Sequence, residues 1–111
     1  MKKIELINGA FIPREKIDYS KGSIVSQQLV SNSAGNITLF SFDEGQQLSE
    51  HTAPFDAVCQ ILEGKAEIHV AKDVYQMNEG EMIIMPANIP HALYAVESFK
   101  MMLIMIRGQA A

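Results

Sequence analysis

Residues 80–95 read GEMIIMPANIPHALYA and contain the pattern that decides the fold. An apolar run at 82–85 stops at a turn that holds two prolines and an asparagine, and apolar residues resume directly after His91. Proline fixes φ and asparagine tolerates turn conformations, so the segment predicts a strand, a tight turn and a second strand. The histidine then stands at the start of the second strand.

The rest of the chain repeats this pattern of short apolar runs between turns. The runs are four to nine residues long, and many are rich in Val, Ile, Phe and Tyr. This spacing is typical of an all-β sandwich or barrel with short hairpins, whereas a helical bundle needs longer periodic segments. The turns are expected at SNSAGN 31–36, DEG 43–45, EGK 63–65, KD 72–73, NEG 78–80, PANIP 86–90 and ES 97–98.

The length of 111 residues is enough for one domain, because a domain of this size buries roughly two-thirds of the surface of its unfolded chain. No internal repeat or second domain interrupts the strand pattern. Residues 1–22 are the least strand-like part, and we expect an N-terminal arm there, with a short helical turn at PREK, 13–16. Residues 23–111 are expected to form the β-domain.

Charge and composition exclude several classes of partner. Nine basic and 13 acidic residues give a net charge of −4, and the charges are interspersed, so no basic patch for nucleic acid is predicted. The single Cys59 excludes an internal disulfide and is typical of a reducing compartment. The longest apolar run, MMLIMI at 101–106, is far shorter than the about 20 residues of a membrane span, and the N-terminal apolar run is too weak for a signal peptide. We therefore expect a cytoplasmic protein with no membrane partner.

Two motifs in this order resemble the signature motifs of the cupin superfamily, whose members are small double-stranded β-helix, or jelly-roll, barrels. The family's first motif is Gly, five residues, His-x-His, three or four residues, Glu, six residues and Gly. Gly45, His51 and Gly64 stand at those spacings in GQQLSEHTAPFDAVCQILEG, 45–64. The resemblance covers about residues 36–107 and implies an all-β jelly-roll β-barrel.

The family's second motif is Gly, five residues, Pro-x-Gly, two residues, His, three residues and Asn. Gly80, Pro86 and His91 match it, whereas Asn88 replaces the second glycine and Ala95 the asparagine. Asparagine tolerates the left-handed backbone conformation better than most residues, so the turn is expected to survive this replacement. The resemblance implies that the turn delivers the chain into a barrel strand, with His91 facing the interior.

The family's histidines and glutamate converge on one metal ion inside the barrel, which implies His51 and His91 as metal ligands here. Ala53 stands in place of the second histidine of the first motif and Ala57 in place of the glutamate, so half of the implied ligands are missing. The implied cofactor is a divalent transition metal, Zn, Fe, Mn or Ni, whose shell would need waters or another donor. A barrel without any metal stays open as the alternative.

Cys59 is the candidate third ligand. In a strand, every second residue counted from Ala57 points to the same side, and this set includes Cys59 and Ile61. A free cysteine is also commonly buried as a small hydrophobic residue, so core packing is the competing interpretation. His69 lies on the polar phase of AEIHV, 66–70, and is expected to face solvent.

A metal-free pocket is the alternative to the metal site. In it, His51 and His91 would form hydrogen bonds with a small organic ligand or exchange protons with it. The two alanines enlarge the cavity and make it more apolar, as small-molecule pockets tend to be. The expected lining is Ala53, Ala57, Ile61, Met85 and Leu93, and further candidates are Phe40 or Phe42, Met82 and alternate residues of 101–105.

Three functions follow from this resemblance. The first is binding of a small molecule around His51 and His91, with or without a divalent metal, and the second is a metal-dependent oxygenase or isomerase. The third is a non-catalytic sensing or scaffolding module.

The other phase of the strand at 57–62, Val58, Gln60 and Leu62, also has too much apolar surface to leave in water. Because cupins commonly pair through such strands, the resemblance implies a homodimer.

Overall fold

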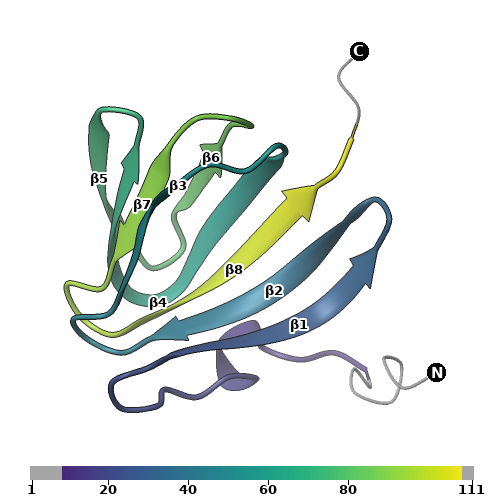
Figure 1. The fold of residues 1–111 in the computed structure, drawn as a ribbon. Coiled ribbons are helices and arrows are strands. Elements are labelled where there is room, and N and C mark those ends of the chain that lie inside the picture. Colours follow the sequence, from purple (N-terminus) through teal and green to yellow (C-terminus); the bar gives the residue numbers. More distant parts are fainter. Residues whose placement is uncertain (1–8, 109–111) are drawn as a thin grey trace.

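The structure is a computed structural model that describes residues 9–108, and almost all of its regular structure is β-strand (Figure 1). The described residues contain no α-helix, so the prediction of an all-β chain is confirmed. No described helix is long and apolar enough to cross a membrane. The elements are the 3₁₀ helix η1 (Pro13–Glu15) and the strands β1 (Ile24–Asn32), β2 (Gly35–Phe42), β3 (Gln47–His51), β4 (Asp56–Val70), β5 (Asp73–Asn78), β6 (Met82–Met85), β7 (His91–Tyr94) and β8 (Phe99–Ile106).

The strands curl into two layers that face each other across one core (Figure 1). One layer has the order β1-β2-β8-β4-β6, and the other has the order β3-β7-β4-β5. Every pairing is antiparallel. The strand β4 belongs to both layers and joins them into a single curled sheet.

Strand β4 runs through the turn that the sequence predicted at 63–65, and that prediction is wrong. Up to Gly64 the strand pairs with β8, and from Lys65 onward it pairs with β5. A register shift between Ile61 and Glu63 and a φ of +81° at Gly64 bend the strand between the layers. Glycine within a strand pattern therefore marks a bend at a corner here, and no hairpin forms.

The core lies between the layers and is centred on Phe42 and Phe99, whose rings stack with centroids 4.5 Å apart. The predicted alternation in the first half of β4 is confirmed, because Ala57, Cys59 and Ile61 are buried in this core. Their neighbours on the other face of β4 are only half-buried.

The N-terminal segment packs on the outer face of the first layer. Ile17 is buried in a second apolar cluster with Leu39, and the Nζ of Lys100 donates a hydrogen bond of 2.7 Å to the carbonyl oxygen of Arg14. The helix η1 lies at the predicted helical turn. Residues 1–8 of the predicted arm lie outside the described residues, and the boundary after residue 22 stays a prediction.

Candidate functional site

A cavity of about 200 Å³ lies between the two layers, where β3 and β7 face β4 and β8. Its only polar side chains, among the described residues, are two imidazoles. Every other lining side chain is aliphatic, aromatic or a thioether. The lining consists of Phe40, Leu48, His51, Ala53, Ala57, Met85, His91, Leu93, Met101, Leu103 and Met105.

The two imidazoles are neighbours, although 40 residues separate them in the sequence. His51 ends β3 and His91 begins β7, and the two are direct Cα partners in the antiparallel ladder. Their ring centroids lie 4.3 Å apart with an angle of 68° between the planes. His91 is 6% exposed and His51 is exposed, so the pair reaches from the cavity to its mouth.

Both rings are held in the same way by the backbone. The Nδ1 atom of His51 lies 2.8 Å from the carbonyl oxygen of Ser49, and that of His91 lies 3.2 Å from the carbonyl oxygen of Ile89. A carbonyl oxygen only accepts hydrogen bonds, so each Nδ1 carries the proton and donates it. In the neutral rings each Nε2 then has a free lone pair, and neither Nε2 has a hydrogen-bond partner within residues 9–108.

Burial lowers the pKa of His91 below its usual value, because the charged imidazolium loses solvation in the cavity. The hydrogen bond to the Ile89 carbonyl raises this pKa, and the neighbouring His51 lowers it again. The net direction is downward, so the structure favours the neutral form of His91. The buried member of the pair is therefore a hydrogen-bond acceptor toward the cavity at neutral pH.

A bulge in β3 adds a lining residue that the sequence did not predict. Leu48 and His51 both face the cavity, although a regular strand places residues three positions apart on opposite faces. The register of β3 against β7 shifts between these two residues, which turns His51 back to the side of Leu48. No residue pattern in the sequence signals this shift.

The cavity contains most of the predicted lining. Ala53, Ala57, Met85 and Leu93 line it, whereas Ile61 does not. The side chain of Ile61 is fully buried in the core further along β4. Of the wider candidates, Phe40 and the alternate residues of β8 line the cavity, whereas Phe42 belongs to the core and Met82 is exposed.

Cys59 is placed in the core and does not line the cavity. Its Sγ donates a hydrogen bond of 3.3 Å to the Sδ of Met101, and burial raises the pKa of the thiol to about 12. This position agrees with the interpretation of Cys59 as a packed hydrophobic residue, and its role as a third ligand stays a prediction.

The donors in the cavity do not fit a divalent metal ion. Within residues 9–108, no group of three His, Cys, Asp or Glu side chains is placed to hold one. Ala53 and Ala57 contribute only methyl groups to the lining. Protein sites for such ions usually supply three or four donors, often including a negative charge, whereas this cavity has two imidazoles and no carboxylate.

His69 lies on the outer face of the second layer, away from the cavity. Its Nε2 is 2.7 Å from the Oε2 of Glu67, and its ring lies against Tyr94 with centroids 4.8 Å apart. The side chain is one-third exposed, so it lies on the predicted outer face but faces solvent only in part. The contacts with Glu67 and Tyr94 explain the position of this ring on the outer face.

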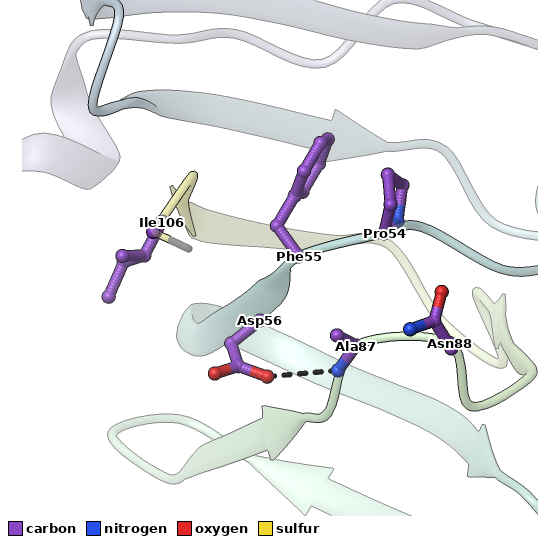
Figure 2. Close-up of a pocket in the computed structure, with 7 residues that line it drawn as sticks. Pro54, Phe55, Asp56, Ala87, Asn88 and Ile106 are labelled. Carbon is purple, nitrogen blue, oxygen red and sulfur yellow. Dashed lines mark hydrogen bonds between the residues drawn. The ribbon is translucent and has the colours of Figure 1, made fainter. Parts of the chain in front are cut away.

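A second, outer pocket of about 360 Å³ is lined by the segment between β3 and β4 and by the turn at Ala87 and Asn88 (Figure 2). Ala53 lines the cavity, whereas Phe55 and Asp56 line the outer pocket. The backbone N–H of Ala87 donates to the Oδ1 of Asp56 at 2.9 Å, and that of Asn88 donates to the Ala53 carbonyl oxygen at 2.8 Å. Asn88 has a φ of +65°, as expected from its place in the turn. The turn therefore holds the segment that forms one wall of the histidine cavity.

Comparisons with known proteins agree with this architecture. The sequence model of the cupin domain family matches residues 38–107. A search of curated proteins found no match.

Solved structures resemble the chain over most of its length. A conserved protein of unknown function from Streptococcus pyogenes is 39% identical, with a TM-score of 0.86 over 92% of this chain and 90% of that one. A cupin 2 conserved barrel domain protein from Leptotrichia buccalis is also 39% identical, with a TM-score of 0.82 over 85% of this chain and 46% of that one. A cupin superfamily protein from Desulfitobacterium hafniense is 24% identical, with a TM-score of 0.87 over 92% and 94%. These likenesses confirm the predicted jelly-roll barrel.

Proposed function

The chain belongs to the cupin family, and from this premise we propose that its barrel binds a small organic molecule in the cavity that His51 and His91 line. The observation that carries the proposal is the pair of adjacent imidazoles inside an otherwise apolar cavity. Small-molecule sites typically combine an apolar lining with a few polar groups that orient the ligand.

The volume of the cavity limits the size of the ligand. An apolar cavity of about 150 Å³ in another protein accommodates benzene, and this one measures about 200 Å³. A molecule with one ring, or an aliphatic molecule of similar size, fills such a space. The thioethers of Met85 and Met105 supply a lining that adapts to the shape of an aromatic or aliphatic body.

A metal-dependent oxygenase or isomerase is the alternative, and the cavity supports it less well. Two imidazoles without a carboxylate are a weak shell for a redox metal that must be held firmly while positions stay open. Binding without turnover, as in a sensing module, requires only the cavity. Elemental analysis of protein purified without added metal tests the alternative, because stoichiometric Zn, Fe, Mn or Ni that is lost in a His51→Ala, His91→Ala variant would favour it.

Methionine methyl groups offer a direct test of ligand binding. Protein labelled with ¹³C at the methionine methyls is titrated at pH 8 with toluene, anisole, phenol and benzoate. We expect at least one of these compounds to shift the methyl signals of Met85 and Met105 in the cavity while the signal of the exposed Met82 stays unchanged. If all four compounds leave the cavity signals in place at millimolar concentration, the proposal is wrong.

We also propose that two copies associate through the outer face of the first layer. Ladder partners on that face form an apolar row across five adjacent strands, and its two ends are exposed. An apolar row of this kind is well suited to packing against a second copy of itself. The row consists of Val30, Ile37, Ile104, Val58 and Ile84.

Sedimentation velocity over a hundredfold range of protein concentration tests the dimer. Ile84→Lys places a charge in the row and is expected to produce monomers, because Ile84 is 61% exposed and tolerates the change in the isolated chain. Val74→Lys is the matched control, since Val74 is 54% exposed but lies on β5 in the other layer. A wild-type protein that sediments only as a monomer would remove this proposal.

A cytoplasmic location is proposed from the single cysteine, which stays a free thiol in the core. Cell fractionation tests this location, and recovery of the protein from the extracellular fraction would contradict it.

A further inference from the structure

We infer that the cavity selects uncharged ligands that donate a hydrogen bond, namely molecules with an apolar body of about one ring and a hydroxyl group. This inference rests on the proposed function and adds the chemical class of the ligand. It comes from the balance of hydrogen-bond donors and acceptors that the cavity presents. The balance is one-sided, as the hydrogen bonds of the two rings show.

The cavity offers acceptors and no side-chain donor. Both Nδ1–H groups are already used by the carbonyl oxygens of Ser49 and Ile89, so the neutral rings present only the lone pairs of Nε2. The other described lining residues have no hydroxyl, amide, ammonium or guanidinium group. A ligand that reaches His91 must therefore bring its own proton to the contact.

The same balance rejects anions and purely accepting ligands. A carboxylate in this cavity would lose its hydration and meet two lone pairs without a side-chain donor, which is a costly form of burial. An ether or ketone of the same shape would fill the apolar space, but the Nε2 of the buried His91 would lose its contact with water without compensation. A hydroxyl group restores that hydrogen bond and leaves the apolar body against the methionines.

The two histidines are expected to contribute differently to the preference for a hydroxyl group. His91 lies inside the cavity at 6% exposure, so its Nε2 depends on the ligand for a partner once water is displaced. His51 is exposed at the mouth, where water can satisfy its Nε2 when the ligand has only one donor. We therefore expect His91 to determine the preference for a hydroxyl and His51 to modulate it.

The test compares phenol, anisole and benzoate in methionine-methyl titrations at pH 8, where an ordinary imidazole is neutral. Phenol and anisole share the ring and differ in the donor, and benzoate carries only acceptors. We expect phenol to bind about fivefold or more tightly than anisole, and benzoate more weakly than both. In His91→Leu the preference for phenol is expected to disappear while anisole still binds.

Two further variants keep the test decisive. His51→Leu changes an exposed position and so preserves the fold if His91→Leu does not, and it is expected to reduce the preference only partly. His69→Leu is the matched control on the outer face and is expected to retain the full preference. Equal binding of phenol and anisole, or preferred binding of benzoate, would overturn the inference and leave the proposed function intact. If no compound shifts the cavity methyls, the proposed function fails as well.

Discussion

Gly64→Ala is expected to be among the most destabilising single substitutions in this chain, because Gly64 bends β4 between the layers. Two effects add at this position. The φ of +81° costs a residue with a side chain about 1–2 kcal/mol. A Cβ atom would also lie 2.2 Å from the carbonyl oxygen of Ser98 and 2.8 Å from the Cα of Phe99, so the backbone must shift. Overpacking of this kind typically costs about 1–3 kcal/mol.

A second glycine separates the two effects. Gly80 has a φ of +87°, but nothing lies within 4 Å of the position that its Cβ would occupy. Gly80→Ala therefore carries the conformational cost alone. We expect the free energy of unfolding to fall by about 2–5 kcal/mol in Gly64→Ala and by about 1–2 kcal/mol in Gly80→Ala.

Urea unfolding followed by circular dichroism measures both variants against the wild type, with midpoints converted through the common slope m. The informative quantity is the difference between the two alanine variants, because the change in the entropy of the unfolded chain is shared. If Gly64→Ala costs no more than Gly80→Ala, the close approach of β4 to residues 98–99 has no energetic weight, and the explanation of the bend is wrong.

Three other predictions concern the site and its surroundings. Combining Ala53→His with Ala57→Glu restores the family's ligand types in the cavity. We expect added Zn²⁺ to raise the thermal midpoint of unfolding of this variant and not of the wild type. No rise would show that these two positions do not converge with His51 and His91. The thiol of Cys59, with its pKa raised to about 12 by burial, is expected to react with an aromatic disulfide reagent only as fast as the protein unfolds, and rapid labelling of the native state would contradict this. Burial and the hydrogen bond to Glu63 raise the pKa of Tyr19, so the folded state holds this proton more tightly than the unfolded state. The stability from this interaction is fully present below about pH 10 and declines as the pH rises further. Tyr19→Phe is expected to remove that part of the decline, as measured by urea midpoints.

The sequence predicted the fold class well, because local patterns carry the information for it. Alternation correctly separated the buried side of β4, with Ala57 and Cys59, from its other face. The motif spacing brought His51 and His91 together because the order and lengths of the strands set which ends meet.

The sequence failed where the backbone departs from regular pairing. Residues 63–65, Glu-Gly-Lys, have the composition of a hairpin turn. Only the contact of Gly64 with residues 98–99 shows that the strand continues through them. Leu48 lines the cavity because of a bulge in β3, and no residue pattern in the sequence predicts this bulge. Cys59 and Ile61 share the inward phase with Ala57, but phase does not say how far along the barrel the open space extends.

The order in which strands pair has a consequence for synthesis of the protein. Strand β8 lies between β2 and β4, although it follows both of them in the sequence. Until residues 99–106 have left the ribosome, β2 and β4 each present an unpaired edge to the cell, and the apolar interior between them cannot close. Nascent chains are therefore expected to need shielding by a chaperone from the synthesis of β2 until β8 has emerged, and the apolar interior closes only then.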